Sequence, residues 1–213
     1  MPKRRTLALA AVLTLGLAAC AKTEIDLPEG EPTDAATVTD SAWNLDPAAS
    51  RLGYVSIKAG EVAENNHFDT LRGTVAPDGT ASLDIDLASV NTGVEIRNER
   101  MRDIFFAVAD NPTATVTAKL DPKAFTGLTV GQSITRPLKA NVTIKGASSD
   151  VETDVLVTRT AEDRVLVVPT APVIISTDMF GLTDELGELR AVAQLPSITP
   201  AVPVTFTLVF TRG

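Results

Sequence analysis

The sequence predicts an all-β domain over residues 43–213 with about eight antiparallel strands, the number at which a closed barrel can hold one small ligand. Three observations support this prediction. Apolar and polar residues alternate with a period of two, Thr and Val are frequent in the alternating runs, and clusters of Gly, Pro, Asp and Ser separate the runs. Such alternation is typical of antiparallel strands with one apolar and one wet face.

Four runs show the alternation most clearly, and each places its apolar residues at every second position. We expect these side chains to share the inner face of the sheet, because successive side chains of a strand point to opposite faces. The inward residues are Leu83, Ile85 and Leu87, then Ala114, Val116, Ala118 and Leu120, then Leu138, Ala140, Val142 and Ile144, and finally Val204, Phe206, Leu208 and Phe210.

Turn residues lie between these runs. The segment 77–79, Pro-Asp-Gly, predicts a hairpin between the strands at 71–75 and 81–87. Residues 145–150 predict a six-residue link to a strand that starts at Val151, and residues 161–164 predict a further turn.

Two segments lack the alternation and predict one or two short helical excursions between strands. Residues 91–106 are rich in charge, and residues 178–190 form the second excursion, with Gly181 and Gly187 expected as breakers. The polar segment 64–67, which ends at His67, is expected to be a surface loop.

Several side chains expected on the inner face are small. Ala114, Ala118 and Ala140 are small, and the whole chain has nine aromatic residues. A β-layer with short inward side chains either collapses into a packed sandwich or encloses an elongated apolar space, which a guest would have to fill. The residues alone leave both alternatives open.

The N-terminus predicts a secreted lipoprotein. Lys3, Arg4 and Arg5 precede an uncharged run from residue 6 to 19 that has the length of a signal-peptide core and is too short to span a bilayer. Residues 17–20, Leu-Ala-Ala-Cys, resemble the lipobox of bacterial lipoproteins. We therefore expect residues 1–19 to be the signal peptide and Cys20, the sole cysteine, to carry the acyl anchor.

Residues 20–42 are acidic and interrupted by Pro and Gly, and they predict a disordered tether between the anchor and the domain. Removal of the signal peptide takes away three basic and no acidic residues, so the net charge falls from −8 to −11. This charge argues against nucleic-acid binding. Ala21, in place of an inner-membrane retention Asp, favours the periplasmic side of the outer membrane.

Six segments, in order, resemble the YceI-like polyisoprenoid-binding family. The best of them contains Ser89-Val90-Asn91-Thr92 followed by an Arg-containing insertion, similar to the family's strand end and helical insertion. Three positions depart from the family pattern: Ala140 replaces a Gly, Asn98 an Asp and Val116 an aromatic residue. The six segments are residues 43–50, 67–73, 87–102, 105–116, 138–146 and 179–181.

The resemblance implies an extended antiparallel, eight-stranded lipocalin-like barrel that holds a long isoprenoid-type lipid, such as a quinone or a polyprenyl chain. We expect no other cofactor. Arg97 and Arg102 would meet the polar head of that lipid at the barrel mouth, or would simply form exposed ion pairs. The residues expected to contact the lipid are Leu83, Ile85, Leu87, Val116, Val142, Ile144, Phe206, Leu208, Arg97 and Arg102.

Enzymatic chemistry finds little support in the sequence. His67 is the sole histidine, and Asp84 and Asp86 alternate with Leu on the wet face of a strand, where solvated carboxylates are the common case. No phosphate-binding loop, catalytic pair or metal-ligand motif appears, so we expect no catalysis and no metal. The alternative to lipid binding is a membrane-anchored protein-interaction or stress-response module with a packed, ligand-free barrel and a protein partner that the sequence does not name.

Overall fold

The computed structural model describes residues 41–212, and they form a closed antiparallel β-barrel with two short helices. The predicted fold class is confirmed. The strands are β1 (Trp43–Leu45), β2 (Arg51–Lys58), β3 (Val62–Phe68), β4 (Leu71–Val75), β5 (Thr80–Asp86), β6 (Val90–Asn91), β7 (Thr113–Lys119), β8 (Ser133–Ile144), β9 (Ala147–Ala161), β10 (Arg164–Pro169), β11 (Val173–Ser176) and β12 (Ala201–Arg212).

The ring closes through β12, which pairs with β10 along one edge and with β1 along the other. From β1 the pairing runs through β4, β5, β7, β8, β9 and β10 and returns to β12, which makes eight strands around the ring. Closure leaves these strands without a free edge in the ring, which removes the sites at which another chain could add a strand.

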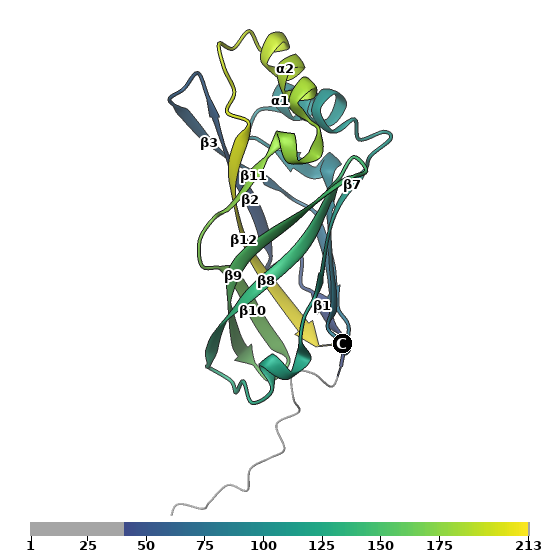
Figure 1. The fold of residues 1–213 in the computed structure, drawn as a ribbon, viewed down its shortest axis with the longest axis vertical. Helices are drawn as coiled ribbons and strands as arrows, with labels where there is room; N and C mark the ends of the chain where they lie inside the picture. Colours follow the sequence, from purple (N-terminus) through teal and green to yellow (C-terminus); the bar gives the residue numbers. More distant parts are fainter. Residues whose placement is uncertain (1–40, 213) are drawn as a thin grey trace, which may run out of the picture. The chain divides into compact units, whose positions relative to one another are not determined.

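Several of the shorter strands lie end to end and extend the barrel wall toward one end. Along one edge of β12, β1 pairs with residues 210–212 and β2 with residues 204–207. Along the other edge, β10 is followed by β11. Figure 1 shows the resulting tall barrel, with the long β8, β9 and β12 crossing it obliquely.

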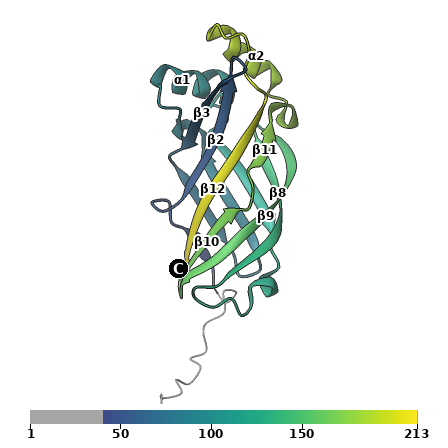
Figure 2. The same ribbon diagram turned by 90° about the vertical axis from the view of Figure 1, so that its left-hand side faces the viewer.

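Both helices lie at the end of the barrel opposite the C-terminus, as Figures 1 and 2 show. Helix α1 (Glu95–Arg100) continues into a π-helix over Met101–Phe106, and α2 (Thr183–Val192) follows a 3-10 turn, Thr177–Phe180. Of the helices described, none is long and apolar enough to cross a membrane.

The second excursion differs from its prediction at one glycine. Gly181 does end the 3-10 turn, in the left-handed conformation with φ 67°. Gly187, by contrast, lies within α2 and does not interrupt the helix. A Gly inside a helix lowers its stability by about 1 kcal/mol relative to Ala, and α2 is supported by packing against the π-helix Met101–Phe106 and the 3-10 turn Thr177–Phe180.

The link between β8 and β9 is much tighter than predicted. Strand β8 ends at Ile144 and β9 begins at Ala147, so the turn consists of Lys145 and Gly146, both with positive φ (49° and 78°). Two-residue hairpin turns with two left-handed residues match the twist of antiparallel strands. The Ser and Asp residues that suggested a loop instead pair across the strands, with Asn141 Nδ2 donating to Asp150 Oδ1 at 2.9 Å.

A second correction concerns residues 64–67, expected as a loop. They belong to β3, which pairs with β2 over seven residues, from Leu52 opposite Phe68 to Lys58 opposite Val62. Their polar composition hid the strand, because the inward face of this hairpin is itself partly polar.

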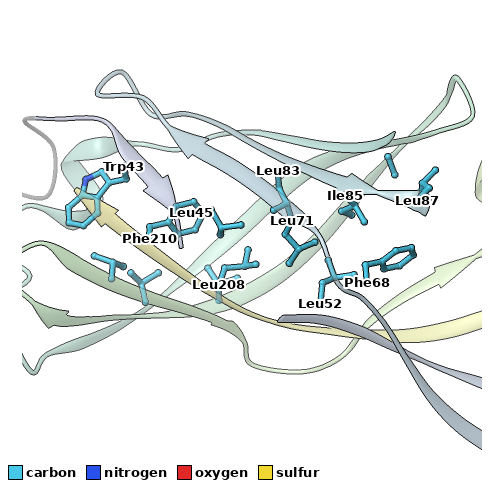
Figure 3. Packing of buried hydrophobic residues seen from close by; sticks show 14 of the residues in the cluster. Trp43, Leu45, Leu52, Phe68, Leu71, Leu83, Ile85, Leu87, Leu208 and Phe210 are labelled. Atoms are coloured by element: carbon cyan, nitrogen blue, oxygen red, sulfur yellow. The ribbon is translucent and has the colours of Figure 1, made fainter. Parts of the chain in front are cut away.

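The predicted inward face is confirmed for the four alternating runs. Leu83, Ile85 and Leu87 are buried, as are Leu208 and Phe210 on β12. Figure 3 shows buried side chains of this kind along the inside of the barrel, from Trp43 at one end to Leu87 at the other.

Candidate functional site

The barrel is hollow. A cavity of about 630 Å³ runs inside it, and its wall contains residues from strands around the ring and from both helices. Ligand sites in proteins commonly have volumes of roughly 300–1,000 Å³. An engineered apolar cavity of about 150 Å³ already binds a benzene ring. The packed-sandwich alternative therefore does not describe this interior.

Nine of the ten residues predicted to contact a lipid line this cavity. The wall includes Leu83, Ile85 and Leu87 of β5 and the residue that follows it, Val116, Val142, Ile144, Phe206, Leu208 and Arg97.

Arg102 is not part of the wall, and its side chain forms an ion pair with Glu95 at 2.5 Å. The reason is angular: five residues along an α-helix rotate a side chain by roughly 140°. Arg97 and Arg102 therefore cannot both face the lumen.

Small side chains account for part of the open volume. Ala81 of β5 lies opposite Ala118 of β7, which in turn lies opposite Ala140 of β8, and all three line the cavity. This alanine row crosses three neighbouring strands in register. Larger residues at these positions would project into the space that is now open.

One end of the cavity, beneath α1, carries charge. Lys58 Nζ lies 3.0 Å from Glu64 Oε1, and Arg97 pairs with the other carboxylate oxygen of Glu64. Arg97 also donates to the carbonyl oxygen of Thr92 at 2.6 Å, which joins α1 to the strand end before it. Burial acts to raise the pKa of Glu64, but the hydrogen bond from Lys58 and the charge of Arg97 outweigh it, so the pKa lies below its usual range.

Tyr54 adds a polar group to this end. Its ring packs against Phe68, with ring centroids 5.9 Å apart, and its side chain lines the cavity. Burial raises the pKa of the Tyr54 phenol strongly, and the nearby charge of Arg97 opposes that effect in part. The phenol therefore stays protonated and can donate a hydrogen bond.

Sequence reasoning missed several wall residues of this end, among them Tyr54, Lys58, Glu64 and Arg100. The available signal was the period-two spacing of 54, 56 and 58, which places these side chains on the same face as Leu52. A mixed polar and apolar inner face does not produce the clean alternation that marks the other strands.

The residues weighed for catalysis lie apart from the cavity. His67 Nε2 is 3.0 Å from Asp69 Oδ1, and both side chains are exposed. Asp84 accepts a hydrogen bond from Thr115 on the outer face, and Asp86 caps the 3-10 helix Leu87–Ser89. Among residues 41–212, no group of three potential metal ligands comes together.

A loop that includes the 3-10 helix Pro122–Phe125 lies at the other end of the barrel. Arg159 of β9, only 3% exposed, donates to the carbonyl oxygens of Leu128 at 3.1 Å and Glu162 at 2.8 Å. Pro122 and Phe125 of the same loop line the cavity. A buried guanidinium thus holds the loop beneath the lumen.

A closed antiparallel barrel of eight strands around an apolar lumen defines a lipocalin-like protein. The chain belongs to the family of YceI-like domains, whose model matches residues 43–210.

The solved structures that are similar to this chain include two that cover most of it. A polyisoprenoid binding domain from Saccharophagus degradans, described as implicated in plant cell wall breakdown, is 37% identical, with a TM-score of 0.79 over 81% of this chain and 99% of that one. BcnA from Burkholderia cenocepacia is 22% identical, with a TM-score of 0.60 over 78% of this chain and 98% of that one, a likeness in fold. No curated protein matches the chain.

Proposed function

We propose that this protein binds one long, apolar, isoprenoid-type lipid in its lumen and stores or carries it in the bacterial envelope. The hollow apolar interior is the observation that carries the proposal, because burial of an apolar chain there would contribute about 25 cal/mol per Å². The 37% identity to a polyisoprenoid binding domain supports the same ligand class. Polyprenyl chains and quinones with prenyl tails both belong to this class.

The lipid would contact the apolar wall residues over most of its length. We assign this role to Leu83, Ile85, Leu87, Val116, Val142, Ile144, Phe206 and Leu208, with Arg97 at the polar end. The alternative of a packed, ligand-free interaction module predicted a filled interior, and the cavity does not agree with it.

Extraction tests the proposal directly. Protein purified without any detergent should release a prenyl lipid into organic solvent, at up to one molecule per chain, when the extract is analysed by mass spectrometry. Protein that has been stripped of lipid should take up an added prenyl alcohol again. A stripped protein that binds no prenyl lipid, together with an empty extract from the native protein, would contradict the function.

The N-terminal predictions lie outside the described residues, and we propose them as the cellular setting of this function. Cys20 would carry the acyl groups, and residues 20–42 would tether the barrel to the periplasmic side of the outer membrane. The lipid anchor would keep the barrel close to the membranes that supply its apolar ligand.

Replacement of the thiol tests this setting. We expect the full chain to fractionate with outer membranes and to have the mass of a cleaved, acylated protein, whereas Cys20→Ser should lack the acyl mass, because a hydroxyl does not form the thioether. An unmodified wild-type Cys20 would contradict the anchor without affecting the barrel's lipid binding, which extraction measures separately.

A further inference from the structure

We infer that the α1 end of the lumen is a head-group subsite for an anionic oxygen group, a carboxylate or a phosphate, at the end of the bound lipid. The inference rests on the proposed function and specifies its ligand. The subsite consists of Lys58, Arg97 and Arg100, with Tyr54 as a neutral donor.

The charges of the cavity wall have the opposite sign to the charge of the protein. Four charged residues of the described chain line the cavity, and three of them, Lys58, Arg97 and Arg100, are basic. Glu64 is the acidic one, so the wall carries a net charge of +2 in a chain whose net charge is −8. All four lie on β2, β3 or α1, so the positive charge is concentrated at one end.

Arg100 is the basic residue that the fold leaves free for a ligand. Arg97 and Lys58 are engaged by Glu64, but Arg100 has no ion pair or hydrogen bond to a side chain in residues 41–212. It lies three residues after Arg97 on α1, a spacing at which helix side chains are neighbours. A bound anion at this end would receive charge-assisted hydrogen bonds from the Arg100 guanidinium and would lie near the positive charge of Arg97.

Tyr54 provides the neutral part of the subsite. Its side chain is partly buried and lines the cavity, and its hydroxyl has no hydrogen-bond partner among the described residues. Buried tyrosine hydroxyl groups usually find a partner, because an unpaired polar group in an apolar site is costly. A head-group oxygen near Arg97 would accept this hydrogen bond.

The wall composition also fixes the direction of the lipid. Beyond the basic end, the wall of the described chain carries no charged side chain and consists mostly of apolar residues, among them Trp43 and Phe125. A polar head placed there would lose its hydration without compensation. The lipid therefore lies with its head beneath α1 and its chain directed toward the loop that Arg159 holds.

Three probes with the same twenty-carbon prenyl chain test the inference: geranylgeraniol, geranylgeranoic acid and geranylgeranyl phosphate. We expect both anions to bind the stripped protein at least tenfold more tightly than the alcohol at low salt, and the advantage to shrink as salt is added. The phosphate and acid arms show which anion the subsite prefers. Equal affinity for all three probes would overturn the inference and leave lipid binding intact, whereas no binding of any probe would overturn the function as well.

Two arginine variants locate the effect. Arg100→Gln should remove most of the anion advantage while the affinity for geranylgeraniol stays the same. Arg102→Gln is the matched control, because Arg102 lies five residues after Arg97 and pairs with Glu95 outside the cavity wall. It should bind all three probes as the wild type does. An equal loss in both variants would show general electrostatic attraction and would overturn the assignment of the subsite.

Discussion

Ala118→Trp should weaken the binding of a twenty-carbon or longer prenyl lipid roughly 100-fold, about 2.7 kcal/mol of binding free energy. Ala118 is the centre of the alanine row, with Ala81 and Ala140 directly opposite it on the neighbouring strands. An indole at this position projects into the open lumen, where it occupies volume that the lipid chain needs. Fluorescence titration of stripped protein with a prenyl lipid measures the loss.

Thr117→Trp provides the matched control for this substitution. Thr117 is the neighbouring residue of β7, is exposed, and points away from the lumen. Thr117→Trp adds an indole to the same strand, but this side chain does not enter the cavity, so lipid affinity should not change. Both variants should unfold at temperatures close to that of the wild type, because neither forces a large side chain into a filled space. Undiminished lipid affinity in Ala118→Trp would show that the lipid does not occupy this cavity.

The barrel strands could be predicted because one physical rule determines their inner face. In β5, β7, β8 and β12 the side chains that leave water are apolar and those that stay in water are polar, so a period of two reveals both the strand and its orientation. The same rule predicts that Val116, Val142 and Leu208 lie on the inner face, and all three line the cavity.

The period-two rule fails where the inner face carries charged side chains as well as apolar ones. On β2 and β3 the inward residues change from Leu52 and Phe68 to Lys58 and Glu64, so the alternation disappears although the strands are well paired. The polar end of the lumen was therefore the part of the site that sequence periodicity could not identify. Helix rotation has the same consequence for α1, since the choice between Arg97 and Arg102 depends on which face of the helix meets the barrel.

Whether the barrel is hollow also could not be decided from composition. Ala114, Ala118 and Ala140 indicate a lack of bulk, but a sandwich could compensate by moving its two sheets closer together. Closure prevents this, because β12 pairs on both edges and fixes the circumference of the ring. The space left by the alanines then remains open.

Arg159→Ala should lower the free energy of unfolding by about 3 kcal/mol. The guanidinium of Arg159 is buried and donates to two backbone carbonyl oxygens, the buried one of Leu128 and the partly buried one of Glu162, and its removal leaves both without this donor. An unsatisfied buried group costs about 1–3 kcal/mol, and the lost packing of the arginine stem adds to it. For a domain of this size the melting temperature should fall by roughly 6–12 °C.

Arg164→Ala, on the adjacent strand β10, is the control for Arg159→Ala, because it removes an arginine that is not buried. Arg164 pairs with Asp46 at 3.2 Å, and its side chain is 39% exposed, so its removal should cost less than about 1 kcal/mol. Denaturant unfolding of both variants, with equal m-values, provides the comparison.

Because the loop that Arg159 holds also forms the cavity floor through Pro122 and Phe125, Arg159→Ala should in addition release bound lipid faster than Arg164→Ala. A destabilised variant with unchanged lipid release would show that the loop stabilises the barrel but does not close the lumen.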